Sequence, residues 1–159
     1  MPAAPTPAIA ALVRAKIPFS LHPYHHDPAT TAFGDEVVAA LGWDPRRVFK
    51  TLVATVDGSL VVGIVPVATQ LDLKALAAAA GGKKAHLARV ADAERSSGYV
   101  AGGISPLGQR KALPTVLDAA ASDFATIMVS AGKRGLQVEL APADLVTVCR
   151  ATLAPISTF

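Results

Sequence analysis

The spacing of apolar residues along the chain predicts short helices interleaved with short strands. Ile9, Leu12 and Val13 recur at helical spacing, which predicts an amphipathic helix over residues 7–16. Alternating apolar and polar residues after Pro18 are typical of a strand over residues 17–23. The same reasoning predicts helices over 31–41, 70–80, 90–97 and 142–149, and strands over 48–56, 59–67, 83–87, 114–117, 126–130 and 136–140.

Turn and capping residues separate these elements. Thr30 or Thr31 is a candidate N-cap for the second helix, and Gly42 is its candidate C-terminal stop. Asp57-Gly58 joins two strongly β-forming segments and predicts a two-residue hairpin turn. This order of elements predicts an α+β fold: one domain over the whole chain, with a curved sheet, mixed or mostly antiparallel, and several short helices.

Composition narrows the possible chemistry. Apolar residues make up 52% of the chain and aromatic residues only 5%, so we expect an aliphatic core. The single cysteine, Cys149, excludes an internal disulfide and a multi-cysteine metal site, and it fits a reducing compartment. No segment resembles a targeting or membrane-spanning sequence, so the expected location is cytoplasmic. The adjacent His25 and His26 would point in different directions, so we predict no metal site.

Cations occur in adjacent pairs although the net charge is only +3. Each pair lies beside a predicted turn or the end of an element, where it either meets phosphates or forms a solvated face. Nucleic acid is therefore a candidate partner. The candidate residues for this contact are Arg46, Arg47, Arg110, Lys111, Lys133 and Arg134.

The candidate working centre is the stretch 98–108, GYVAGGISPLG, which holds four glycines and one proline. Glycine lets a ligand approach the main chain closely, while Pro106 fixes its own φ and favours an extended Ser105. The stretch is either a rigid cradle for a ligand or an ordinary turn. It matches neither the phosphate-binding glycine motifs nor the nucleophile elbow.

Lys50 is the second candidate. Strand alternation places Phe49 and Thr51 on one face and Lys50 on the other, beside apolar Leu52 and Ala54. A lysine in that position either extends its ammonium to solvent or holds a cation at the mouth of a pocket. Tyr24, at the end of the first predicted strand, either lines a pocket or covers the core with its ring.

Several ordered blocks together resemble a known family. They are Phe49-Lys50-Thr51-Leu52, Val65-Pro66-Val67, Gln70 to Lys74, the stretch 98–108, Leu113-Pro114-Thr115, Gly132 to Leu136, and Glu139-Leu140-Ala141. From about Ile17 to the C-terminus the chain is similar to the YbaK family of free-standing editing domains, specifically its Cys-tRNA(Pro) deacylases.

The resemblance implies an enzyme without a cofactor that removes cysteine from tRNA(Pro), and also from tRNA(Cys), with prolyl-tRNA synthetase as a candidate partner. It implies that Lys50 is essential and that Gly102 shapes the pocket. The further pocket residues that it implies are Tyr24, Gly103, Ile104, Ser105, Pro106 and Ser130.

The family chemistry implied by the resemblance needs no protein nucleophile, because the thiol of the bound cysteine attacks its own ester. Backbone N–H groups near Gly102 and Gly103 are then expected to stabilise the oxyanion. One departure stands out: members of the family commonly have an aspartate where this chain has Gln137, so no carboxylate role is carried over. Two alternatives remain: a trans-editing enzyme that removes alanine from tRNA(Pro), and a non-catalytic module that binds aminoacyl-tRNA or a synthetase.

Overall fold

The computed structural model describes residues 6–159 as five α-helices, one 3-10 helix and ten strands. The helices are α1 (Pro7–Arg14), α2 (Phe33–Leu41), α3 (Leu73–Ala79), α4 (Val90–Ser97), α5 (Pro142–Cys149) and the 3-10 helix η1 (Ala119–Asp123). The strands are β1 (Ser20–Pro23), β2 (Phe49–Val56), β3 (Ser59–Pro66), β4 (Gln70–Leu71), β5 (Ala85–Leu87), β6 (Thr115–Asp118), β7 (Ile127–Lys133), β8 (Leu136–Leu140), β9 (Thr152–Ala154) and β10 (Ser157–Thr158).

The larger sheet has five strands in the order β5-β2-β3-β6-β9. β2 pairs antiparallel with β3 and β5, whereas β6 runs parallel to both β3 and β9. The predicted hairpin turn is confirmed, because Asp57 and Gly58 both adopt positive φ (49° and 86°), as this tight turn requires. One face of the sheet packs on the main core, and the other packs on α3 through Leu76 and Ala77.

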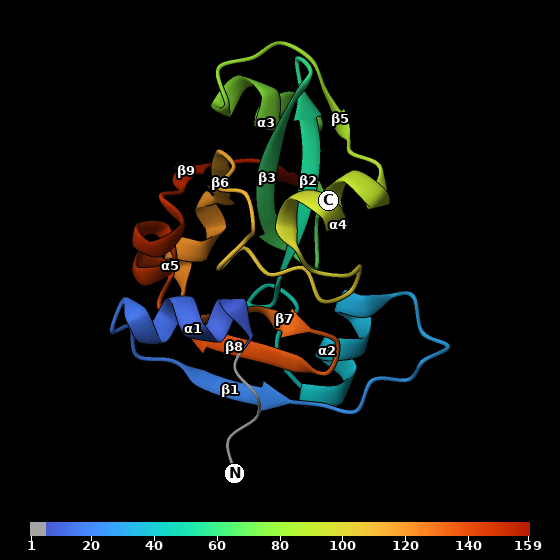
Figure 1. Cartoon of the computed structure of the whole chain (residues 1–159), viewed down its shortest axis with the longest axis vertical. Coiled ribbons are helices and arrows are strands. Elements are labelled where there is room, and N and C mark those ends of the chain that lie inside the picture. Colours follow the sequence, from blue (N-terminus) through green and yellow to red (C-terminus); the bar gives the residue numbers. More distant parts are fainter. Residues whose placement is uncertain (1–5) are drawn as a thin grey trace.

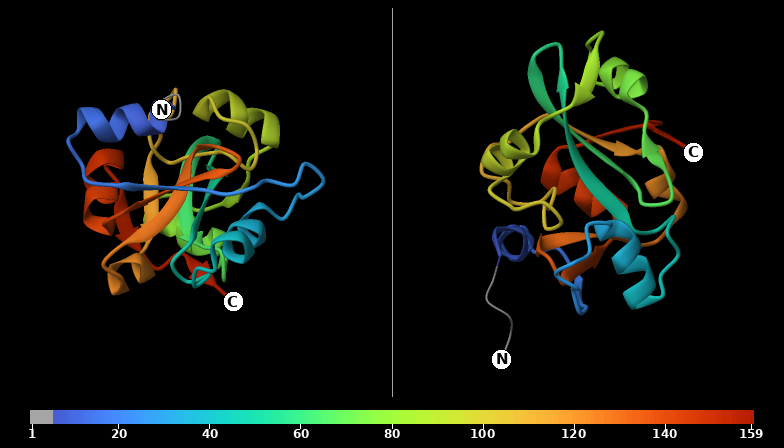
Figure 2. Two further views of the ribbon diagram at one scale, coloured as in Figure 1. Left: turned by 90° about the horizontal axis from the view of Figure 1, so that it is seen from below. Right: turned by 90° about the vertical axis from the view of Figure 1, so that its right-hand side faces the viewer.

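The smaller sheet is antiparallel, in the order β1-β8-β7, and it crosses the lower end of the molecule in Figure 1. α1 and α2 flank it on opposite sides (Figure 2). Leu136, Val138 and Leu140 of β8 face the main core, to which α1 contributes Leu12. Met128 of β7 instead packs in the cluster that α2 covers.

The two sheets meet where β2 begins. Val48 forms an isolated parallel bridge with Met128 of β7, so the start of β2 runs directly beside the smaller sheet. The first residues of β2, Lys50 among them, are thereby held against the face that α2 covers. This junction is where the candidate site lies.

The structure confirms the predicted α+β class with mixed and antiparallel strands, and α4 and α5 have the predicted bounds. It also differs in several places. The strands form two main sheets and a two-stranded ribbon of β4 with β10, not one sheet. The N-cap of α2 is Ala32, without a side-chain cap, so the expected threonine cap is wrong, whereas Gly42 ends the helix in the left-handed conformation as predicted. The segment after α5, for which the sequence predicted no helix or strand, adds β9 and β10.

Within residues 6–159, no helix has the length and apolar character needed to cross a membrane.

Candidate functional site

A cavity of about 330 Å³ lies at the junction of the two sheets. Its wall is built from five parts of the chain: the start of α2, the first half of β2 with the residue before it, the residue after β3, the glycine-rich stretch, and the face of the smaller sheet turned toward α2. The lining residues are Phe33, Gly34, Val37, Val48, Phe49, Lys50, Thr51, Leu52, Val67, Ala101, Gly102, Ile104, Ser130 and Gln137.

The glycine-rich stretch is held rigidly from behind. Gly98 ends α4 with φ of 82°. The Tyr99 hydroxyl donates a hydrogen bond of 2.6 Å to the Leu107 carbonyl across the loop, and burial raises the pKa of this phenol to about 12. The Ala101 N–H donates to a Glu94 carboxylate oxygen at 2.8 Å. The loop therefore presents a fixed edge to the cavity.

Gly102 is required by both its backbone and its neighbour. Its φ is 85°, where a side chain is strained, and a Cβ there would lie 2.6 Å from Cδ1 of Phe33. The Phe33 ring therefore packs directly on the bare main chain of Gly102. The Arg134 guanidinium lies 5.0 Å from the centre of the same ring and donates a 2.7 Å hydrogen bond to the Ala101 carbonyl.

Lys50 is half-buried and borders the cavity. Burial lowers the pKa of its ammonium, and the charge of Asp35 opposes that shift. The predicted alternation is confirmed, since Phe49 and Val53 belong to the main core while Leu52 packs with the α3 cluster. Lys50 is the only cation among the described residues that line this cavity.

A second hollow of about 460 Å³ adjoins the first. The two share Phe33, Gly34, Lys50 and Val67, so Lys50 lies at their boundary. The exposed Phe159 borders the outer hollow, because β10 pairs with β4 and brings the end of the chain there. The arrangement provides a small inner chamber and a wider outer one with a cation between them.

Of the residues expected in the pocket, the cavity brings together Lys50, Gly102, Ile104 and Ser130. Tyr24 is absent from its lining. The Tyr24 ring packs instead against the cluster that contains Val37, which is the core-covering alternative stated for it.

Three neighbours of Ile104 also lie outside the cavity lining, and all three are buried: Gly103, Ser105 and Pro106. The Gly103 N–H donates to the Val100 carbonyl at 2.8 Å, so this N–H already has a partner within the loop. The Ser105 hydroxyl accepts a hydrogen bond from the Leu107 N–H, and the Pro106 carbonyl accepts one from the Cys149 thiol. Their polar groups hold the loop together and do not face the cavity.

The cation pairs differ in availability. The Arg46 guanidinium pairs with Asp44 at 2.7 Å and remains largely exposed. Arg47 is turned inward and binds Thr126, whereas Arg134 is exposed and donates to the loop through its Nε. Arg110, Lys111 and Lys133 are exposed.

Among the lining residues that the sequence did not place in the pocket, three bear on its chemistry: Phe33, Thr51 and Gln137. Phe33 reaches the site only because Gly102 lacks a side chain. Thr51 Oγ1 and Gln137 Oε1 are the buried side-chain polar atoms without a hydrogen-bond partner within residues 6–159. Gln137 had been singled out for its residue type, but nothing in the sequence indicated its unpaired oxygen.

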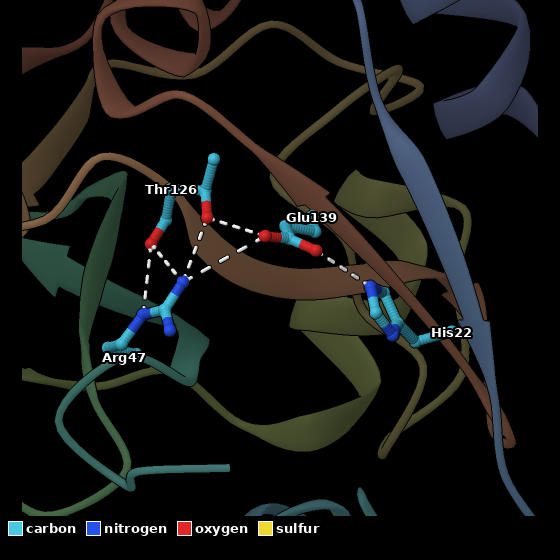
Figure 3. Close-up of polar contacts among 4 residues, drawn as sticks. All are labelled: His22, Arg47, Thr126 and Glu139. Atoms are coloured by element: carbon cyan, nitrogen blue, oxygen red, sulfur yellow. Dashed lines mark hydrogen bonds and ion pairs between the residues drawn. The ribbon is translucent and has the colours of Figure 1, made fainter.

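A different polar cluster lies farther along the same strand, β8. One Glu139 oxygen accepts from His22 Nε2 at 2.8 Å, and the other accepts from the Thr126 hydroxyl. Arg47 donates to the Thr126 hydroxyl at 2.8 Å and lies 4.3 Å from the centre of the Trp43 ring. Figure 3 shows Glu139 between His22 and the Arg47–Thr126 pair.

Within residues 6–159 no group of histidine, cysteine, aspartate or glutamate is arranged to hold a metal ion.

Comparison with known proteins shows which family has this fold and sequence. Residues 26–148 match the family described as the aminoacyl-tRNA editing domain. The chain belongs to this family. A curated relative from Enterococcus faecalis, named "Putative Cys-tRNA(Pro)/Cys-tRNA(Cys) deacylase EbsC", is 43% identical over 126 residues, which cover 78% of this chain and 76% of the relative. The family resemblance drawn from the sequence blocks is confirmed.

Solved structures share the fold of this editing domain. The crystal structure of a hypothetical protein superposes with a TM-score of 0.86 at 21% identity and covers 96% of this chain and 100% of its own. The crystal structure described as a "putative trans-editing enzyme for prolyl tRNA synthetase" gives a TM-score of 0.77 at 21% identity, with 89% and 87% covered. At this identity the likeness establishes the fold alone.

Proposed function

We propose that this editing domain is an aminoacyl-tRNA deacylase that removes cysteine from tRNA(Pro), and also from tRNA(Cys). Membership of the editing-domain family and the name of the relative from E. faecalis support the class of reaction. The observation that carries the proposal is the inner cavity, which is small, mostly apolar and bordered by Lys50 and Gly102.

The dimensions suit the end of a charged tRNA. The inner cavity would take the aminoacyl group and the outer hollow the terminal adenosine, with the ester between them near Lys50. Lys50 would then bind the carbonyl oxygen or the adjacent phosphate, and its partial burial would strengthen that contact relative to one in water.

The reaction would need no protein nucleophile. The substrate thiol attacks the ester carbonyl carbon, a sulfur–carbon bond forms, and the bond from that carbon to the ribose oxygen breaks. The thiol proton ends on the ribose oxygen, and the products are a cyclic cysteine thiolactone and free tRNA. Holding sulfur and carbonyl in reactive proximity contributes roughly 7–11 kcal/mol in well-oriented cases.

Affinity for tRNA itself should be weak and sensitive to salt. The net charge is only +3, and Arg47 already binds Thr126 within the protein, so few counterions would be released from the phosphates. A synthetase partner such as prolyl-tRNA synthetase would supply the missing affinity.

The test compares purified protein on Cys-tRNA(Pro), Cys-tRNA(Cys), Ala-tRNA(Pro) and Ser-tRNA(Pro), with products identified by mass. We expect cysteine to be removed as the thiolactone and the serine ester to be cleaved slowly. Lys50→Ala should lower the rate at least about a hundredfold, the range seen when one charge-stabilising group is lost. Lys83→Ala is the matched control, since Lys83 is exposed and lies outside both hollows.

The largely apolar wall favours one other reaction, removal of alanine from tRNA(Pro). Faster cleavage of the alanine ester than of the cysteine ester would establish it in place of the cysteine reaction. Binding of charged tRNA without any cleavage would instead identify a non-catalytic module.

A further inference from the structure

The unpaired polar atoms of the cavity indicate what it binds. Gln137 is 4% exposed, and its Oε1 has no partner, as is also true of Thr51 Oγ1. Leaving a buried polar group without a hydrogen bond costs about 1–3 kcal/mol. Both residues border the same cavity, so a ligand that reaches them would remove this cost.

The rest of the wall limits the kind of ligand. The side chains around these two residues are mostly aliphatic or aromatic, among them Phe33, Val37 and Ile104. None of the described lining residues carries a carboxylate, so a cationic side chain would be buried there without a counter-charge. A side chain that suits this cavity is short, uncharged at entry, and polar at its end.

Gln137 can form a hydrogen bond with such a group whether the group is protonated or deprotonated. An amide carries an acceptor oxygen and a donor NH₂, and a half-turn of the side-chain end exchanges them. It can accept from a thiol and donate to the thiolate that forms from it. A hydrogen bond donated to a thiolate lowers the pKa of the thiol, whereas a carboxylate at the same position would raise it.

We propose that the Gln137 amide, assisted by the Thr51 hydroxyl, binds the thiol of the aminoacyl group, which makes Gln137 a residue that determines specificity. This inference rests on the proposed deacylation. It adds that the cavity selects the substrate side chain, because the uncharged Gln137 amide binds the polar end of that side chain.

The first experiment measures kcat/KM for Cys-, Ser- and Ala-tRNA(Pro) with the wild type and with Gln137→Leu. Loss of one hydrogen bond should lower the rate on the cysteine ester about tenfold and leave the alanine ester within about twofold, so the Cys/Ala ratio falls. An equal loss on both esters, or no loss, would overturn the inference. A fall for the serine ester alone would identify a hydroxyl ligand in place of the thiol.

Two further variants separate recognition from packing. Gln137→Glu keeps the shape and adds a charge, and we expect the pH of half-maximal cysteine removal to rise by about one unit. An unchanged pH profile would contradict a contact with the thiol. Thr51→Val should lower the Cys/Ala ratio about threefold, while Thr55→Val, also on β2 but outside the cavity lining, should not change it. Gln137→Met replaces the leucine variant if the latter does not fold.

A binding measurement separates this inference from the proposed function. Calorimetry with amide-linked cysteinyl- and alanyl-adenosine, which cannot be cleaved, should show about tenfold tighter binding of the cysteinyl compound to the wild type and equal binding to Gln137→Leu. If the wild type cleaves no ester yet shows this preference, the deacylase proposal fails and the recognition stands. If both variants bind the two compounds equally, the recognition fails whatever the activity.

Discussion

Gln137 and Glu139 lie two positions apart on β8 and therefore on the same face of the smaller sheet, opposite the face formed by Leu136, Val138 and Leu140. Glu139 has partners for both of its oxygens, from His22 and Thr126, and Gln137 has none for its Oε1. The more deeply buried of the two is the one left unpaired.

This difference separates a structural region from the proposed binding region on one strand. The Glu139 cluster joins β1, β8 and the segment before β2, so its hydrogen bonds serve the fold. The Gln137 region borders a cavity with a bare glycine main chain and a half-buried lysine, whose burial costs stability. Groups whose hydrogen bonds are complete stabilise the protein, and groups whose hydrogen bonds are incomplete indicate where a ligand supplies them.

The largest effect is expected from breaking the complete cluster. Glu139→Leu leaves His22 and Thr126 without their common acceptor and Arg47 without the carboxylate with which it forms an ion pair at 3.8 Å. It should lower the free energy of unfolding by about 2–3 kcal/mol. Urea unfolding at pH 7 measures this loss. A change below about 0.5 kcal/mol would show that the cluster does not stabilise the fold.

The same cluster predicts a pH dependence. The hydrogen bond from Thr126, followed by the contacts with His22 and Arg47, holds the pKa of Glu139 below its ordinary value of 4.5. A carboxylate with a lowered folded-state pKa stabilises the protein above the unfolded-state pKa, and this contribution disappears as the pH falls through the folded-state value. The gap between wild type and Glu139→Leu should therefore narrow below about pH 4.5, and a constant gap would contradict it.

The next largest effect is expected at the bare main chain of the cavity. Gly102→Ala places a Cβ against the Phe33 ring at a backbone angle of 85°, and should lower the free energy of unfolding by about 1–2 kcal/mol. It should also displace the Phe33 ring, which removes part of the cavity wall. Gly42→Ala, also at positive φ but with open space around it, is the control that isolates the backbone cost from the clash.

A smaller effect of opposite sign is expected for Lys50→Met. Burial lowers the pKa of the Lys50 ammonium in the folded state, so between the folded and unfolded pKa values the unfolded chain binds more protons, and stability rises with pH there. Below that range the cost is present in full. Removing the charge should raise the melting temperature at pH 7 by about 1–2 °C while activity is lost. A lower melting temperature would mean that the ammonium stabilises the fold.

Gln137→Leu should not lower stability at all. Burial of the unpaired oxygen costs free energy, so its removal should raise the free energy of unfolding, by up to about 1 kcal/mol. Urea unfolding of this variant and of Glu139→Leu in the same experiment compares the two regions directly. Equal losses for the two variants would remove the distinction between the two regions.

The sequence predicted those parts of the fold whose signals are local. α4 and α5 are bounded by Gly98 and Pro142, and the turn Asp57-Gly58 fixes the hairpin by its own geometry. β9 and β10 were missed because three and two residues carry no periodic pattern, and they become strands only beside β6 and β4. Their pairing depends on partners far away in the sequence.

The site residues that the sequence predicted were likewise those with local signals. Lys50 and Gly102 were predicted from strand alternation, glycine content and family resemblance, and the cavity brings them together. Phe33 could not be predicted, because its place depends on a contact between α2 and a loop almost seventy residues later. Tyr24 and Gly103 were also expected in the pocket, but the Tyr24 ring packs against the core and the Gly103 N–H donates to the Val100 carbonyl within the loop.

The turn between β7 and β8 carries a consequence for how the cavity admits its ligand. Arg134 holds the Ala101 carbonyl, and Gly103 packs so closely on Lys133 that a Cβ would lie 2.8 Å from the Cα of that lysine. Turn and loop thus move as a single piece, and the width of the chamber on this side is set before any ligand arrives. Under the proposed function, an amino acid that is too broad would meet a fixed boundary there, so the chamber would exclude it by size without having to close.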